Sequence, residues 1–226
     1  MTSVKDYFRE IASVYDSIAL RAMPRYEEML SEIVRCLPVG AGDILELGCG
    51  TGALTALLAQ QYTDANLTAV DAAPEMIEIA RDRLNRTGVS SGRVSFTVSL
   101  FEKMSLPDGS YDLVASNMSL HHIADKPPFY ERMRRSLRPG GYLVLGDELK
   151  TAISHVQRLN WDGWLEFASQ PGHLDDKQIA AIIQHDNEFD HYETLPDQIQ
   201  MLAGAGFRSV DCVWRWTNYA ILIAEA

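Results

Sequence analysis

The spacing of hydrophobic residues changes along the chain, from a helical period at the start to short apolar runs that predict strands. Apolar side chains recur at helical spacing over residues 5–19 and 23–37, which predicts two helices. Short apolar runs then predict strands at residues 43–47, 67–70, 94–98, 111–116 and 142–146. Helical segments lie among these strands, at residues 53–61, 74–87 and 127–137. Strands and helices that alternate in this way predict βαβ units, a parallel sheet and right-handed crossovers.

The alternation stops after residue 147. Residues 151–190 are helical and rich in Trp, His and Gln, and we interpret them as an insertion that packs over the strand ends. A helix at 194–204 and two β-rich runs at 208–216 and 219–225 follow, which predicts a C-terminal hairpin with one strand antiparallel to the rest. We therefore expect one α/β domain over 1–226, divided into N-terminal helices (1–40), a core (41–148), a helical cap (149–192) and a C-terminal helix with a hairpin (193–226).

Charge and cysteine content narrow the possible partners. The net charge is −11, so the surface repels phosphate backbones, and nucleic acid is not an expected partner. One basic cluster, on residues 132–138, is interpreted as the solvated face of a helix. Cys36, Cys49 and Cys212 are odd in number and far apart, which favours a reducing compartment. The start of the chain lacks a secretory signal, and no apolar run approaches the roughly 20 residues that cross a bilayer. We expect a cytoplasmic monomer or homodimer without membrane association.

A glycine loop follows the first predicted strand. In Glu46-Leu47-Gly48-Cys49-Gly50-Thr51-Gly52, the glycines permit a close approach of a ligand to the main chain, and the next helix begins immediately afterwards. Asp71 ends the second strand, where an acidic side chain can bind both hydroxyls of a ribose.

The same loop also satisfies the fingerprint of nicotinamide dinucleotide enzymes, because Gly48, Gly50 and Ala53 have the G-x-G-x-x-A spacing. Two observations argue against that cofactor. Glu46 precedes the glycines, where its charge repels a pyrophosphate but suits an ammonium group. About forty residues, mostly helical, also precede the first strand, whereas dinucleotide domains often begin with it.

The motifs from residue 40 to residue 148 together resemble those of class I S-adenosylmethionine-dependent methyltransferases. They are the glycine loop with its strand, Val70-Asp71, Pro107-Asp108-Gly109-Ser110-Tyr111-Asp112, Ser116-Asn117 and Leu137-Arg138-Pro139-Gly140-Gly141, and their order and spacing match. The resemblance implies a Rossmann-like fold with a seven-stranded, mostly parallel sheet, S-adenosylmethionine as cofactor, and methyl transfer, for which we expect a small-molecule acceptor that the sequence does not name. Residues 21–26 and 213–224 resemble, more narrowly, the branch that includes carboxy-S-adenosylmethionine synthase.

The resemblance also implies roles for individual residues. The methionine part of the cofactor would lie against Glu46, Gly48, Cys49, Gly50 and Asn117. Asp71 would hold the ribose, and the adenine would lie beside Ala72 and Met76. Tyr26 matches a cofactor-contacting tyrosine of the narrower branch. Leu100 and Phe101 fall where the family has an acid followed by a small or apolar residue, so the adenine hydrogen bond must come from elsewhere, with Glu102 as one candidate.

Candidate catalytic residues follow the fourth strand. Transfer from a sulfonium mainly needs positioning and desolvation, and a base is needed only if the acceptor must lose a proton. His121 and His122 are the candidate bases, and the alternative is that they only cap or pack the following loop.

Other polar and aromatic residues lie in or beside the cap. The histidines there lack the i, i+4 spacing of a helical metal site, so no metal is expected. Trp161, Trp164 and Phe167 belong either to the core or to an acceptor site. The sequence leaves three functions open: a small-molecule methyltransferase, a carboxy-S-adenosylmethionine synthase-like enzyme, and a non-catalytic cofactor-binding module.

Overall fold

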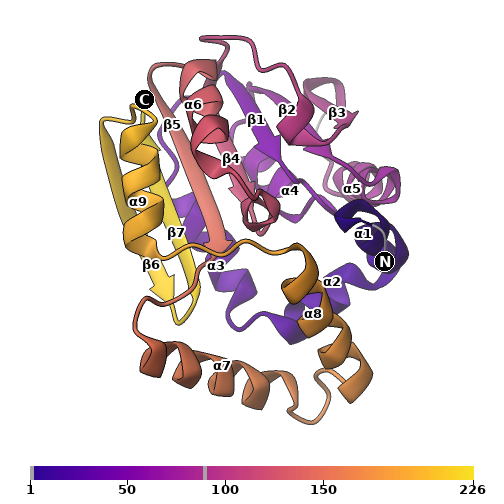
Figure 1. Ribbon diagram of the computed structural model, residues 1–226. Helices are drawn as coiled ribbons and strands as arrows, with labels where there is room; N and C mark the ends of the chain where they lie inside the picture. Colours follow the sequence, from indigo (N-terminus) through magenta and orange to yellow (C-terminus); the bar gives the residue numbers. More distant parts are fainter. Residues whose placement is uncertain (1–2, 89–90) are drawn as a thin grey trace.

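A seven-stranded sheet runs through the centre of the computed structural model, which describes residues 3–88 and 91–226 (Figure 1). The first two residues of the expected N-terminal segment lie outside this description. The strands are β1 (Asp43–Leu47), β2 (Asn66–Asp71), β3 (Val94–Val98), β4 (Tyr111–Asn117), β5 (Leu137–Glu148), β6 (Ser209–Trp216) and β7 (Tyr219–Glu225). Their order is β3-β2-β1-β4-β5-β7-β6, with β1 to β5 parallel and β7 antiparallel to both of its neighbours. The predicted mostly parallel sheet with an antiparallel C-terminal hairpin is confirmed.

The strands predicted from apolar runs form the centre of this sheet, where their side chains are buried. Leu113, Val114 and Ala115 of β4 are each 0% exposed, because helices cover both faces. Helices α3 (Tyr26–Arg35), α4 (Ala53–Gln61) and α5 (Pro74–Arg86) pack on one face, and α6 (Lys126–Ser136) and α9 (Leu195–Gly204) pack on the other. Residues of the central strands β1, β4 and β5 therefore enter two separate hydrophobic clusters, one on each face of the sheet.

Two predicted elements differ from the structure by more than a shift of a few residues at their ends. The first expected helix is divided into α1 (Val4–Ile11), the short helix η1 (Ala12–Val14) and α2 (Tyr15–Ala22). The fifth strand was expected to begin at Tyr142, but β5 begins at Leu137, which pairs with Tyr111. The Pro-Gly-Gly sequence was expected to end the helix, but α6 ends at Ser136, the chain is already extended at Leu137, and Gly140, with a φ of 78°, lies within the strand.

The segment between β5 and α9 forms two helices, α7 (Ser154–Ala168) and α8 (Asp176–Phe189), which lie next to the N-terminal helices (Figure 1). The rings of Tyr7 and His185 stack with centroids 4.0 Å apart. The Trp164 indole donates a hydrogen bond to the Ala22 carbonyl over 2.9 Å. Segments far apart in the sequence thus meet over one end of the sheet. Across residues 3–88 and 91–226, no helix has the length and apolar character needed to span a bilayer.

The order in which strands are added to the sheet reverses between β1 and β4, which are parallel neighbours. The chain passes from β1 to β2 and β3 on one side, then returns to β4 on the other side of β1. In open α/β sheets, ligands bind beyond the carboxyl ends of the strands at such a point. The glycine loop after β1 and Asn117 at the end of β4 both lie there.

Candidate functional site

The glycine loop closes tightly over the end of β1. The backbone amides of Gly48 and Cys49 both donate to the Val70 carbonyl over 2.9 Å. Gly48 has a φ of 70°, and a Cβ there would lie 2.0 Å from the Ser119 hydroxyl oxygen. Gly52 has a φ of 81°, and a Cβ there would meet Ala80 at 2.9 Å. These two positions therefore need glycine for the loop to approach its neighbours.

Glu46 carries a buried carboxyl group beneath this loop. The residue is 1% exposed, and its Oε2 atom has no hydrogen-bond partner among the described residues. Burial raises the pKa of this carboxyl to about 8. A buried carboxylate is stable only when a charge or hydrogen-bond donor compensates it, so the arrangement suits a cationic ligand group.

Asp71 connects the glycine loop to the start of α5. Its Oδ2 atom accepts a hydrogen bond from the Gly50 amide over 2.8 Å, and Oδ1 accepts one from the Ala73 amide over 2.9 Å. Burial raises the pKa of this carboxyl. Each oxygen has a second lone pair, so the carboxylate can hold the loop and still accept hydrogen bonds from a ligand.

A first cavity lies above these groups and encloses about 880 Å³, including its open mouth. Its lining contains every residue that the sequence predicted for cofactor binding: Tyr26, Glu46, Gly48, Cys49, Gly50, Asp71, Ala72, Met76, Leu100, Phe101 and Asn117. Glu102 also lines it, so the family acid missing at Leu100 has a neighbour that can replace it. Asn117 hydrogen bonds to Tyr26 through its side chain, while its Oδ1 atom has no partner among the described residues.

The N-terminal helices supply lining residues that the sequence did not reveal as functional. Lys5, Phe8 and Tyr15 line the first cavity. Asp16 fixes this segment, because it accepts a hydrogen bond from the Thr51 hydroxyl over 2.5 Å and forms an ion pair with Arg83. No local motif signals these contacts, since each joins residues more than thirty positions apart.

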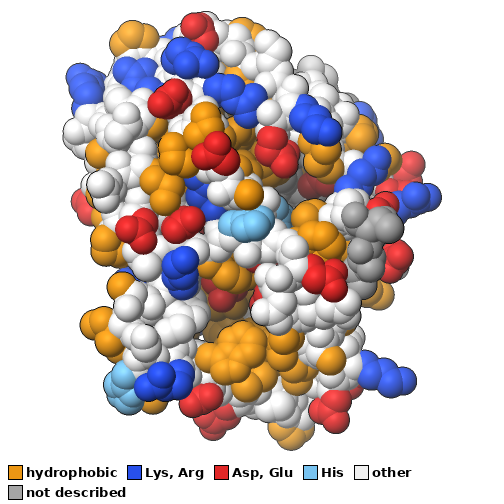
Figure 2. Space-filling view, in the orientation of Figure 1, with side chains coloured by type: hydrophobic (Ala, Val, Ile, Leu, Met, Phe, Trp, Pro, Cys, Tyr) orange, Lys and Arg blue, Asp and Glu red, His pale blue; other side chains and the backbone are white. Residues whose placement is uncertain are grey.

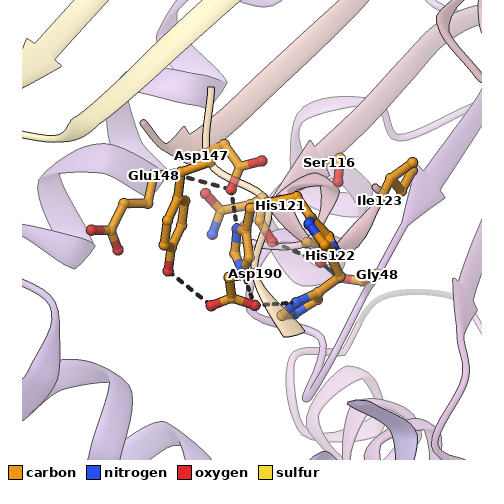
Figure 3. A network of polar contacts seen from close by, with 12 residues as sticks. Gly48, Ser116, His121, His122, Ile123, Asp147, Glu148 and Asp190 are labelled. Carbon is orange, nitrogen blue, oxygen red and sulfur yellow. Dashed lines mark hydrogen bonds and ion pairs between the residues drawn. The ribbon is translucent and has the colours of Figure 1, made fainter. Parts of the chain in front are cut away.

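His121 and His122 follow β4 in the short helix η4 (Leu120–His122), and each faces a carboxylate (Figure 3). The His121 Nδ1 atom lies 2.5 Å from Oδ1 of Asp147. The His122 Nδ1 atom lies 2.7 Å from Oδ1 of Asp190, which also accepts a hydrogen bond from the Tyr192 hydroxyl over 2.8 Å. The sequence had not singled out Asp190 or Tyr192.

The two histidines hold different charges at neutral pH. Burial lowers the pKa of His121, but the Asp147 carboxylate outweighs it and raises the pKa to about 9. Burial and the charge of His121 lower the pKa of His122 to about 4. His122 is therefore neutral. Because its Nδ1 donates to Asp190, the lone pair is on Nε2, which has no partner among the described residues.

One trio of possible metal ligands meets within the described part of the chain. The ligating atoms of His121, His122 and Asp190 lie within 4.8 Å of one another. The hydrogen bond between His122 and Asp190 already joins two members of the trio, and Asp147 holds the third. The absence of a metal stays a prediction.

A second cavity of about 800 Å³, including its open mouth, adjoins the first. Phe8, Tyr15, Met118 and His122 line both, whereas His121 lines only the second. The cap contributes Trp161 and Trp164 to the second cavity, but Phe167 is not part of that lining. Trp161 is 37% exposed, so it belongs to the cavity mouth rather than to the core. In Figure 2 this face of the molecule is hollowed near the cap, with acidic and hydrophobic side chains visible inside.

Comparisons with known proteins agree with this geometry. The family model described as "Methyltransferase domain" matches residues 45–145. A carboxy-S-adenosyl-L-methionine synthase of Nautilia profundicola is 27% identical over 97% of this chain and 93% of its own length. A malonyl-[acyl-carrier protein] O-methyltransferase of Acetivibrio thermocellus is 35% identical over 61% of this chain, which spans only 46% of that relative. An S-adenosylmethionine-dependent methyltransferase structure from Mesorhizobium loti superposes with a TM-score of 0.63 at 18% identity, covering 87% of this chain and 96% of that one.

Proposed function

The chain belongs to the class I S-adenosylmethionine-dependent methyltransferases, and from this premise we propose that it methylates a small-molecule acceptor by in-line displacement. The observation that carries the proposal is the pair of adjoining cavities. The first contains the expected cofactor residues, the second has room for an acceptor, and His122 lies between them.

The residues of the first cavity fit S-adenosylmethionine. The buried carboxyl of Glu46, with its unpartnered Oε2, would bind the ammonium group of the methionine part. The backbone of Gly48, Cys49 and Gly50 would lie against the methionine part, and Gly48 lets this loop approach Ser119, where a Cβ would clash. Asn117 and Tyr26 would contact the same end of the cofactor.

The other end of the first cavity fits a nucleoside. Asp71 would accept hydrogen bonds from the ribose hydroxyls in addition to the two that it accepts from the backbone. Ala72, Met76, Leu100 and Phe101 would lie beside the adenine, since all four line the same cavity. When bound, the cofactor supplies a methyl group on a sulfonium, which leaves as a neutral thioether.

His122 and His121 would take different parts in the transfer. His122 is neutral and holds its Nε2 lone pair free, so it can accept a proton or a hydrogen bond from the acceptor. His121 is positively charged and is held by Asp147, so it would not remove a proton. Its charge would instead keep the neighbouring His122 neutral. The N-terminal helices and the cap would exclude water from the reacting atoms.

A carboxy-S-adenosylmethionine synthase-like activity is the second candidate, favoured by the length over which that relative matches. It would need a cationic side chain for the additional carboxylate. Lys5, an exposed residue of α1, is the cation in the lining of the first cavity, and the described lining of the second contains neither Lys nor Arg.

A cofactor-binding module without catalysis is the third candidate, and the free lone pair of His122 argues against it. A cytoplasmic location and a monomeric or homodimeric state remain part of the proposal, and the three free thiols agree with a reducing compartment.

Calorimetry with S-adenosylhomocysteine and with NAD tests the proposal. We expect the thioether to bind and NAD not to bind, because the buried Glu46 carboxyl can pair with an ammonium group but offers no compensating charge to a pyrophosphate. Native mass spectrometry of the protein as purified would separate the first two candidates, since a retained carboxylated nucleoside differs in mass from S-adenosylmethionine. Tight NAD binding without any response to S-adenosylhomocysteine would overturn the assignment.

A further inference from the structure

We propose that the second cavity binds its acceptor as a cationic amine, and that the atom methylated is a nitrogen. The inference rests on the proposed function, because it names the class of acceptor that this cavity would present to the cofactor. Three features carry it: the charge of the lining, its aromatic side chains, and the groups at the junction with the first cavity.

Of the carboxyl groups in the lining, Asp190 is already held by His122, whereas no ion pair among the described residues involves Glu148 or Asp186. Glu148, Asp186 and Asp190 line the second cavity, and no Lys or Arg is among the described residues around it. Burial raises the pKa of Glu148 to about 7, and burial together with Glu148 raises the pKa of Asp186. Glu148 and Asp186 are therefore partly protonated in the empty cavity at neutral pH, and a bound ammonium group would stabilise their ionised forms.

The histidines do not cancel this negative charge. The charge of His121 is matched by Asp147, which lies outside the cavity lining. Burial lowers the pKa values of His122 and of His185, so both are neutral. An acceptor that carries a carboxylate or phosphate would meet three acidic groups and neither Lys nor Arg in the described lining, and the charged imidazole there, His121, is already paired with Asp147.

Aromatic rings complete a site for a cation. The rings of Trp161 and Trp164 lie 5.2 Å apart at 34° to each other, and the Trp164 indole is fixed by its hydrogen bond to Ala22. Tyr7 and Tyr192 lie in the same lining. Aromatic faces attract ammonium groups and also cover an apolar body, which fits a small amine with a hydrophobic substituent.

The junction with the first cavity places the nitrogen near the cofactor. His122 lines both cavities, and Asp190 contacts His122 at 2.7 Å (Figure 3). A bound ammonium must lose a proton before its nitrogen can attack. In the proposed step, one N–H bond breaks and the proton goes to the unpartnered Nε2 atom of His122, which lines both cavities. The nitrogen lone pair then forms the N–CH₃ bond while the methyl–sulfur bond breaks, and that electron pair stays on the neutral thioether.

Binding of three matched probes to the full chain saturated with S-adenosylhomocysteine tests the inference. The probes are 2-phenylethylamine, 2-phenylethanol and 3-phenylpropanoate, measured by calorimetry in the presence of EDTA. We expect the amine to bind at least about tenfold more tightly than the alcohol, and the carboxylate not to bind. Glu148→Gln and Asp186→Asn should each reduce the preference for the amine, whereas Glu188→Gln, an exposed carboxyl on the same helix as Asp186, should leave it unchanged.

Binding of S-adenosylhomocysteine shows whether each variant is folded, because its cavity does not contain Glu148 or Asp186. If the unmodified protein does not bind it, the proposed function fails and the inference fails with it. If it binds but the amine shows no advantage over the alcohol, or the carboxylate binds best, the inference alone is wrong. A stoichiometric divalent metal in the protein before EDTA, with no amine binding after it, would assign the acidic cluster to a metal and also overturn the inference.

Discussion

Replacing Glu46 by glutamine should stabilise the ligand-free protein and weaken cofactor binding, two effects of opposite sign. The carboxyl is 1% exposed and has an unpartnered oxygen, so its ionised form is unfavourable until a cation arrives. Glutamine has nearly the same shape but no charge. A residue that only held the fold together would destabilise the protein when changed, so the sign of the effect separates the two roles.

The size of the expected stabilisation follows from the pKa of Glu46. Burial raises it from 4.5 to about 8, so between these values the folded protein holds a proton that the unfolded chain has lost. Rising pH across this window therefore lowers the free energy of unfolding. At about 1.36 kcal/mol per pH unit the full cost is roughly 5 kcal/mol, and water entering the site reduces it to about 2–5 kcal/mol. In a chain of 226 residues, even about 2 kcal/mol shifts Tm by roughly 4–8 °C.

Thermal unfolding at about pH 9 and about pH 5, with and without S-adenosylhomocysteine, measures both effects. At the higher pH, Glu46→Gln should raise the Tm of the free protein, and at the lower pH the difference should nearly vanish. Loss of a charge-assisted hydrogen bond should weaken binding of S-adenosylhomocysteine about 10- to 150-fold.

Glu102→Gln is the matched control for Glu46→Gln, because this exposed carboxyl lines the same cavity but should not alter Tm. The reasoning is refuted if Glu46→Gln lowers Tm at both pH values, or if binding stays unchanged.

Three further outcomes are expected. Gly48→Ala should lower Tm and abolish binding of S-adenosylhomocysteine, because its Cβ would lie 2.0 Å from the Ser119 hydroxyl oxygen at a φ of 70°; an unchanged Tm would contradict the described loop. Asp71→Ala should weaken that binding more than Glu102→Ala, measured by calorimetry, and equal small effects would mean that Asp71 does not face the ribose. Hydrogen exchange should show that residues 151–190 and helix α1 gain protection when S-adenosylhomocysteine binds, since the two contact each other beside the cavities; equally slow exchange in both states would make the cap fixed structure.

The sheet and the glycine loop could be predicted because their signals are local. Strands buried on both faces are continuous apolar runs, and the hairpin is marked by two β-rich runs with Thr217-Asn218 between them. The start of β5 was missed because Leu137 is held extended by its pairing with Tyr111, a contact that no local pattern reveals.

The acceptor side of the site could not be predicted for the same physical reason. Asp190 meets His122 across 68 residues, and His185 stacks on Tyr7 from the opposite part of the chain. Each is an ordinary polar residue in its own segment, and only the tertiary fold brings them together. His121 and His122 were found because they follow a strand whose carboxyl end faces the crevice, but the carboxylates that set their charges were not paired with them.

The contacts between the N-terminal helices and the helical cap affect the order in which the protein can fold during synthesis. Arg21 donates a hydrogen bond to the His173 carbonyl across 152 residues, and Asp16 reaches Arg83 across 67. The contact with Arg83 can form once α5 has left the ribosome, whereas the contact with His173 must wait until the cap has been synthesised. The first cavity needs no residue beyond His122, whereas the second needs the cap and Tyr219, so the cofactor side of the site can form earlier during synthesis than the acceptor side.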